Sequence, residues 1–198
     1  FTEGNDLGTA RYALSASGTL TAGLVFGGTA DGFVAHTEEY DGTSYSEQNN
    51  LSATKAYMSG FGTQTASLAI SGQLSNNTVP VNVELYDGTS WTETANLSTS
   101  RGGHAGAAGT TASGMVFGGL ANNRGGQGAP ASALVEAWDG TSWTETANLA
   151  TARFLVGGAG TSATSVLAFG GRTAPPVPSF TNATEEFSEA AVIKTITD

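Results

Sequence analysis

Four basic residues occupy the same position of a repeated sequence pattern, and they are the first candidates for chemistry in the chain. Each follows a leucine by a few residues, and the four are Arg11, Lys55, Arg101 and Arg153. One interpretation is a ring of cations around one opening of the molecule, which would bind carboxylates. The other is ion pairing with the equally regular glutamates Glu38, Glu84, Glu136 and Glu185. A residue present in every repeat usually serves the packing of that repeat, which favours the ion pairs.

The residues that could carry out catalysis or bind a metal do not form a set. The two histidines, His36 and His104, stand at non-equivalent places without a second ligand at metal-binding spacing. Asp41, Asp87 and Asp139 lack the spacing of a calcium loop and are interpreted as turn formers. The chain has no cysteine and no Gly-x-Ser-x-Gly motif, so a nucleophile is missing. We therefore expect no enzyme activity, no metal and no cofactor.

Ligand binding is better supported, by four polar segments of unequal length that follow the apolar stretches of the repeat. They span residues 29–37, 73–82, 120–133 and 172–183. Variable loops on a rigid repeated scaffold are the usual place for binding, although loops can also drift without a role. Amide and aromatic side chains suit sugars or a polar protein surface. The candidate binding residues are Asp31, Phe33, His36, Asn76, Asn77, Asn122, Asn123, Arg124, Gln127 and Phe180.

The elements that must position these residues are repeats. The stretch Asp-Gly-Thr-Ser-Trp-Thr-Glu-Thr-Ala-Asn-Leu occurs at residues 87–97 and 139–149, and a diverged copy occurs at 41–51. The aromatic residue that opens the second half of each copy, in the series Phe1, Tyr45, Trp91 and Trp143, recurs at steps of 44, 46 and 52 residues. Self-similarity at this period indicates a repeat architecture.

Each repeat predicts four short strands. The first has small residues, and the second is apolar at consecutive positions, which suits a strand buried on both faces. Asp-Gly-Thr-Ser joins the third and fourth strands and predicts a hairpin whose Asp-Gly pair takes the positive φ of a primed turn. Alternation places Trp91, Glu93, Ala95 and Leu97 on one face of the fourth strand. Four antiparallel strands per repeat, arranged radially, predict an all-β fold, a β-propeller.

The repeats resemble the kelch repeat. The match is an Arg before the first strand, Gly-Gly closing the second, an aromatic residue in the third and Trp opening the fourth, over nearly the whole chain. One departure is Ser71, which replaces the first glycine of the pair. Asp-Gly-Thr-Ser-Trp-Thr-Glu is more similar to kelch-type repeats of phage, prophage and environmental bacterial proteins than to those of animals. The resemblance implies a kelch-like propeller. The Asp-Gly-Thr-Ser-Trp-Thr-Glu motif implies a location on a virion or cell-surface appendage.

The expected organisation is one propeller domain over residues 1–198. Residues 1–7 would be an orphan fourth strand, that is, one without the first three strands of its repeat in the given sequence. Blades follow at 8–51, 52–97, 98–149 and 150–198. Residues 192–198 fit the fourth strand of the last blade. We expect the chain to be the C-terminal part of a larger propeller, and the alternative is that residues 1–7 close the ring as a strap.

Composition limits the partners. The net charge is −10 with seven Lys and Arg residues, so phosphate backbones would be repelled and nucleic acid is not expected. No apolar run approaches the length of about 18 residues that a membrane span needs. The absence of cysteine leaves the compartment open.

The sequence therefore predicts a non-enzymatic binding module on a virion or extracellular surface, such as a tail-fibre adhesin or a decoration protein. Its partner would be a protein or glycan of a host surface, or neighbouring virion subunits, and a homo-oligomer is compatible with this function. One alternative is a structural virion or scaffold subunit that makes protein–protein contacts. Another is a glycan-cleaving propeller enzyme that uses loop carboxylates such as Asp31 at a separation of about 5–10 Å.

Overall fold

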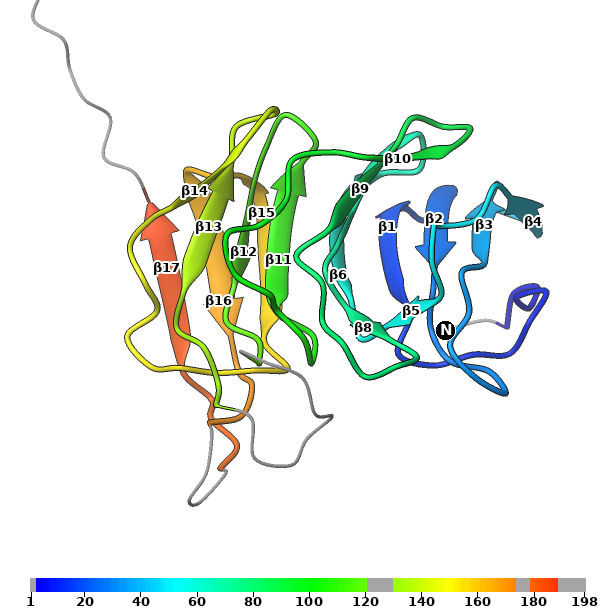
Figure 1. The fold of residues 1–198 in the computed structure, drawn as a ribbon. Helices are drawn as coiled ribbons and strands as arrows, with labels where there is room; N and C mark the ends of the chain where they lie inside the picture. The colour runs from blue at the N-terminus through cyan, green and yellow to red at the C-terminus, as the bar shows by residue number, and fades with distance from the viewer. Residues whose placement is uncertain (1–2, 121–129, 174–178, 189–198) are drawn as a thin grey trace, which may run out of the picture.

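Four antiparallel sheets form a 4-blade β-propeller in the computed structural model, which describes residues 3–120, 130–173 and 179–188 (Figure 1). Blade 1 contains β1 (Ser15–Thr19), β2 (Ala22–Phe26), β3 (Thr37–Tyr40) and β4 (Tyr45–Gln48). Blade 2 contains β6 (Ser59–Thr63), β7 (Ala66–Ile70), β9 (Val83–Tyr86) and β10 (Trp91–Glu93). Blade 3 contains β11 (Gly106–Thr110), β12 (Ser113–Phe117), β13 (Val135–Trp138) and β14 (Trp143–Glu145). Blade 4 contains β15 (Gly157–Ser162), β16 (Ser165–Phe169) and β17 (Thr184–Ser188).

The predicted all-β propeller is confirmed, and in every blade the strands follow one another as antiparallel neighbours. A fifth, two-stranded sheet pairs β5 (Lys55–Ala56) with β8 (Gln73–Leu74) beside blade 2. The fourth strand predicted for blade 4, at residues 192–198, lies outside the described residues. In the described parts of the chain there is no helix, and hence none that could cross a membrane.

Apolar side chains of the second strands build three cores, one between each pair of successive blades. We call the side of a blade that points to the next blade its front face, and the opposite side its rear face. Leu24 and Phe26 on the front face of blade 1 pack with Ala69 and Tyr86 on the rear face of blade 2. The same arrangement recurs between blades 2 and 3 and between blades 3 and 4. The predicted burial of the second strands on both faces is therefore confirmed for blades 1–3.

The first strands, β1, β6, β11 and β15, lie side by side along the inside of the propeller. Their small residues are required by this close approach. A Cβ atom on Gly60 would come within 2.6 Å of both the Leu68 carbonyl oxygen and the Phe26 ring. Real Cβ atoms do not approach other atoms so closely, and Gly60 therefore allows blades 1 and 2 to meet.

The turns between third and fourth strands differ from the predicted primed turns. Only the glycines adopt positive φ, with 91° at Gly88, and the loop has four residues. The Asp87 carboxylate instead accepts the backbone N–H groups of Thr89 and Ser90 at 2.9 and 2.8 Å. This side-chain bond replaces the backbone geometry of a tight turn. The other two Asp-Gly-Thr-Ser turns repeat it.

The predicted alternation along the fourth strand is wrong beyond Glu93. Trp91 packs backward on Phe26 of blade 1, with ring centroids 4.9 Å apart. Leu97 lies in the core between blades 2 and 3, on the opposite side. The reason is that β10 ends at Glu93, after which the Leu97 N–H group donates to the Val81 carbonyl at 3.0 Å.

Ser71 adopts the backbone conformation of the glycine that it replaces. Its φ is 53°, whereas the equivalent Gly27 and Gly118 have 62° and 67°. The buried Ser71 hydroxyl donates to the Pro80 carbonyl at 2.7 Å and accepts the Arg101 N–H group at 3.2 Å. These bonds offset the cost of a left-handed residue with a side chain, which is on the order of 1 kcal/mol or more.

Candidate binding site on the loop face

The four repeated cations are buried in ion pairs. The pairs are Arg11–Glu38, Lys55–Glu84, Arg101–Glu136 and Arg153–Glu185. The cationic side chains are 0–3% exposed, so the interpretation as an open ring that binds carboxylates is wrong. Arg101 and Arg153 also donate to backbone carbonyl groups of their own blades, and burial keeps all four cations from a ligand.

The second oxygen of each glutamate holds the chain that enters the blade. Glu136 accepts the Ser98 N–H group at 2.8 Å, and Glu84 accepts that of Ser52 at 2.8 Å. Arg101 also donates to the carbonyl groups of Gly118 and Leu134, at 3.1 and 2.6 Å. Burial lowers the pKa of Arg101, and its bond to Glu136 opposes this shift. The ion pairs thus join the strands of one blade to the connection from the preceding segment.

The candidate site lies at the end of the propeller where the second strand leads into the loop before the third; we call this end the loop face. Four residues that precede the first strands have left-handed backbone there, and none is a glycine. They are Ala13, Tyr57, His104 and Leu155, with φ of 54°, 55°, 50° and 54°. Left-handed conformation in residues with side chains costs energy and is enriched at functional sites.

Backbone hydrogen bonds link these left-handed residues from blade to blade. The Tyr57 N–H group donates to the Ala13 carbonyl at 2.9 Å, and the His104 N–H group donates to the Tyr57 carbonyl at 3.2 Å. The Leu155 N–H group donates to the Gly103 carbonyl at 3.2 Å. The backbone is similar in the four blades, with one additional left-handed residue in blade 3, Gly103, whose φ is 65°, and the side chains that it presents differ.

Aromatic rings gather around Tyr57, and we call Tyr12, Phe33, Tyr57 and His104 the aromatic cluster. The Tyr57 ring makes edge contacts with His104 at 5.5 Å and with Phe33 at 6.2 Å between centroids. Burial raises the pKa of Tyr57, and the neighbouring Tyr12 raises it further. Burial also lowers the pKa of His104, so the imidazole is neutral at pH 7. The cluster is uncharged at that pH, and Tyr12 is 61% exposed.

Blade 4 places a cation between aromatic rings on the same loop face. Phe154 and Arg172 form a backbone bridge, and Arg172 forms a second bridge with Phe180. The Arg172 guanidinium lies 5.6 Å from the centre of the Phe154 ring and 5.2 Å from that of Phe180. Phe180 is 84% exposed. Blade 1 has the same two backbone bridges, which join Tyr12 to Thr29 and Thr29 to Phe33.

The sequence-predicted loop residues are distributed unevenly. Phe33 belongs to the aromatic cluster and Phe180 to the Arg172 stack, whereas Asp31 is exposed. The carbonyl of His36 accepts the Gly27 N–H group at 2.9 Å, and its side chain lines a small cavity with Glu38. The predicted residues Asn122, Asn123, Arg124 and Gln127 lie outside the described residues.

Asn76 and Asn77 shape their own turn. The side-chain Oδ1 atom of Asn76 accepts the Thr78 N–H group at 3.0 Å, and Oδ1 of Asn77 accepts the Gln73 side-chain amide at 2.8 Å. Asn77 has φ of 66°, a conformation that asparagine tolerates better than most residues. Their hydrogen-bonding capacity is partly used within the loop.

The most concentrated part of the site was not among the sequence-predicted residues. Tyr12, Tyr57 and His104 lie before the first strands, not in the loops that the repeat pattern indicated. The sequence did hold one signal of this site. The cation recurs in every repeat, whereas the second or third residue after it changes in chemistry from repeat to repeat. Phe154 and Arg172 show the same contrast.

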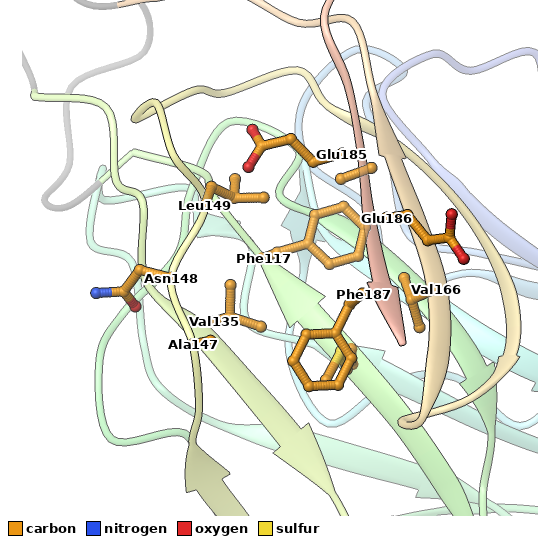
Figure 2. A pocket seen from close by; sticks show the side chains of 11 residues that line it. Phe117, Val135, Ala147, Asn148, Leu149, Val166, Glu185, Glu186 and Phe187 are labelled. Carbon is orange, nitrogen blue, oxygen red and sulfur yellow. The ribbon is translucent and has the colours of Figure 1, made fainter. Parts of the chain in front are cut away.

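An apolar cavity of about 160 Å³ lies elsewhere, between blades 3 and 4. Figure 2 shows Phe117, Val135, Val166 and Phe187 around it, with the carboxylates of Glu185 and Glu186 turned outward. In the other interfaces Trp91 and Trp143, which open fourth strands, pack against Phe26 and Phe61 of the preceding blade. The cavity thus belongs to blade packing and is not part of the candidate site.

Comparison with known proteins gives the chain no family: no family of known proteins matches its sequence, and no curated protein does. The fold defines the class, a β-propeller of four antiparallel blades. Among the residues that the structure describes, no three His, Asp or Glu side chains come together as a metal site would require.

Proposed function

We propose that this protein is a non-enzymatic binding module whose ligand contacts the loop face at the aromatic cluster. One observation carries the proposal: the left-handed residue two places before each first strand differs from blade to blade, being Ala13, Tyr57, His104 and Leu155, and in blade 3 it follows a left-handed glycine, Gly103. Packing alone would favour one residue type at a repeated position, as it does for the buried cations. Different side chains on a recurring, strained backbone are typical of recognition.

The chemistry of the loop face suits a glycan. Aromatic faces pack against the apolar faces of sugar rings, and the Tyr hydroxyl groups and the neutral imidazole can hydrogen-bond sugar hydroxyls. Arg172, held between Phe154 and Phe180, adds a cation that pairs with an acidic sugar. The kelch-like repeats, and the similarity of their Asp-Gly-Thr-Ser-Trp-Thr-Glu motif to phage repeats, support a location on a virion or cell-surface appendage. The protein would then be an adhesin whose partner is a host-surface glycan.

The test compares binding by the wild type and by two alanine variants. Wild-type chain is applied to a glycan array, and binding to the best glycan is then measured by calorimetry. Tyr57→Ala removes the centre of the cluster and should weaken binding about tenfold, since an aromatic contact contributes about 1 kcal/mol or more. Leu20→Ala is the matched control, because Leu20 is 87% exposed at the opposite end of blade 1.

Two results would contradict the proposal. Equal binding by wild type and Tyr57→Ala would place the ligand elsewhere. No signal on the array, together with no capture of host envelope material, would remove the adhesin function. A structural virion subunit is then the second candidate, and the exposed apolar side chains Leu167 and Phe169 on blade 4 support it.

A further inference from the structure

The front face of blade 4 is uncovered, unlike the front faces of the other blades. Leu167 and Phe169 are 41% and 42% exposed, whereas the equivalent Leu24 and Phe26 of blade 1 are both 0% exposed. The register of β16 fixes this equivalence, since Phe169 pairs with the first residue of β15 as Phe26 does with that of β1. Figure 1 shows blades 1 and 4 at opposite ends of the row of sheets.

The rear face of blade 1 carries the side chains that cover a front face elsewhere. In blade 2 the covering pair is Tyr86 and Trp91, with ring centroids 5.0 Å apart. In blade 3 it is Trp138 and Trp143, at 5.1 Å. Blade 1 has Tyr40 and Tyr45 at 4.7 Å, and both are partly exposed. Blade 1 and the described part of blade 4 therefore each present one half of the contact that joins successive blades.

We propose that the front face of blade 4 docks onto the rear face of blade 1 of a second copy of this chain, head to tail. Phe169 and Leu167 would pack on the Tyr40–Tyr45 pair as Phe26 and Leu24 pack on Tyr86 and Trp91. Two copies bring together eight blades, which is within the range of four to eight that propellers use. A head-to-tail contact between two copies of this kind makes a closed ring when the rotation permits.

A polar match supports this pairing independently of the apolar one. Between blades 1 and 2, the Tyr86 hydroxyl donates to the Glu39 carboxylate at 3.1 Å. Glu186 occupies the position of Glu39 in blade 4, and Tyr40 occupies that of Tyr86 in blade 1. A carboxylate thus stands on the free front face where a tyrosine hydroxyl would arrive.

The other two interfaces lack both members of this polar pair. Leu85 is in the core that contains Trp138, and Ala137 is in the core with Phe187. Glutamate on the front face therefore goes with tyrosine on the rear face, and an apolar residue goes with a ring that has no hydroxyl. A hollow of about 320 Å³ beside Ala159, Leu167 and Glu186 leaves room for the Tyr40 side chain.

Residues 3–8 already fill the remaining part of the contact. The Gly8 N–H group donates to Glu38 at 2.7 Å, as the Ser52 N–H group donates to Glu84 at 2.8 Å. The Asn5 amide donates to the Thr43 carbonyl at 2.8 Å, as Asn49 does to Thr89 at 2.9 Å. The segment that a preceding blade normally contributes to this place is supplied by the chain itself, so a second copy needs to bring only its sheet face.

A disulfide designed on the internal interface tests the proposal. The hydroxyl oxygens of Ser17 and Ser67 lie 2.8 Å apart across blades 1 and 2. By register, the equivalent positions of the proposed contact are Ala159 and Gly23, and a Cβ on Gly23 meets nothing closer than 3.5 Å. The chain has no cysteine, so a designed pair is free of competing thiols.

We expect Ala159→Cys chains mixed with Gly23→Cys chains to form a disulfide-linked species of twice the chain mass on mild oxidation. The double variant Ser17→Cys/Ser67→Cys should cross-link within one chain and serves as the control for geometry. If the mixed single variants give no cross-link while this control does, the proposal is wrong. If Ala159→Cys/Gly23→Cys in one chain cross-links only at monomer mass, the chain closes on itself and the second copy is excluded.

The uncrosslinked protein gives a second measurement. Sedimentation should show a monomer–dimer equilibrium that Phe169→Asp weakens at least tenfold, because a carboxylate would be buried against two rings. Leu20→Asp is the control, since it places the same charge on an exposed apolar residue at a turn, away from the proposed contact. A wild type that stays monomeric at every concentration tested would overturn the proposal.

Discussion

At the scale of single residues, one buried glutamate organises each blade. Glu136 binds Arg101 through one oxygen and the Ser98 N–H group through the other, and neither charged side chain is more than 1% exposed. An ion pair buried in this way gives little net stability, but removal of one partner leaves an uncompensated charge. Glu185 makes the equivalent bonds to Arg153 and Ala150, with a side chain that is 27% exposed.

Replacement of these glutamates should therefore have unequal effects. Glu136→Gln removes the negative charge beside buried Arg101 and should lower the free energy of unfolding by about 3–5 kcal/mol. Glu185→Gln should cost less, because water reaches that pair and screens the remaining charge. Urea unfolding of both variants measures the difference. Equal losses would mean that the shared geometry, not the burial, determines the effect.

At the scale of elements, the hairpin between third and fourth strands depends on an aspartate side chain. The Asp139 carboxylate accepts N–H groups from Thr141 and Ser142, both at 2.8 Å, and the Ser142 hydroxyl at 3.0 Å. The Ser142 and Thr141 N–H groups lower the pKa of Asp139 below its usual value of 3.8. The ionised form is thus the one that the folded hairpin prefers.

A folded-state pKa below the unfolded value fixes the sign of the pH dependence. The contribution of Asp139 to stability is present above its ordinary pKa and is lost as the pH falls through the lowered one. Asp139→Ala should lower the melting temperature at pH 7, whereas Asp139→Asn should retain the acceptor and lose the acid dependence of this site. Thermal melts from neutral to strongly acidic pH test this. Identical acid profiles for wild type and Asp139→Asn would contradict it.

Sequence patterns predicted the sheets well because the period, the Gly-Gly pairs and the apolar triplets are dictated by packing. They predicted the Arg–Glu pairing for the same reason. They failed where one local contact overrides a period, as at Leu97, which reaches the opposite core after β10 ends. The aromatic cluster was not predicted because Tyr57 and His104 come from different blades, and only the folded backbone brings them together.

At the scale of the whole molecule, blade 4 is packed less completely than the blades before it. Its described sheet has three strands, Leu167 and Phe169 on its front face are partly exposed, and a cavity of about 160 Å³ lies beside its core with blade 3. Blades 2 and 3 are covered on both faces by neighbours. Local stability follows buried contacts, so it is not uniform along the chain.

Hydrogen exchange should report this gradient. Amides of β16 should exchange faster than those of β7 and β12 when the protein concentration is kept low, because fewer apolar contacts oppose local opening. Mass spectrometry of peptides from each blade measures the rates. Uniform protection across the blades at low concentration would show that the propeller opens only as a unit.

The recurring contact between blades has an evolutionary consequence. The same pair of a basic residue with a glutamate, the same backbone donor and the same leucine recur from blade to blade, while the side chains at the loop face differ. A gene that duplicates or exchanges one blade therefore preserves the ion pair and the backbone hydrogen bond on both sides of it, whereas the front-face residue and the facing ring must still match. New specificity can be acquired by recombination of whole repeats whose facing residues match.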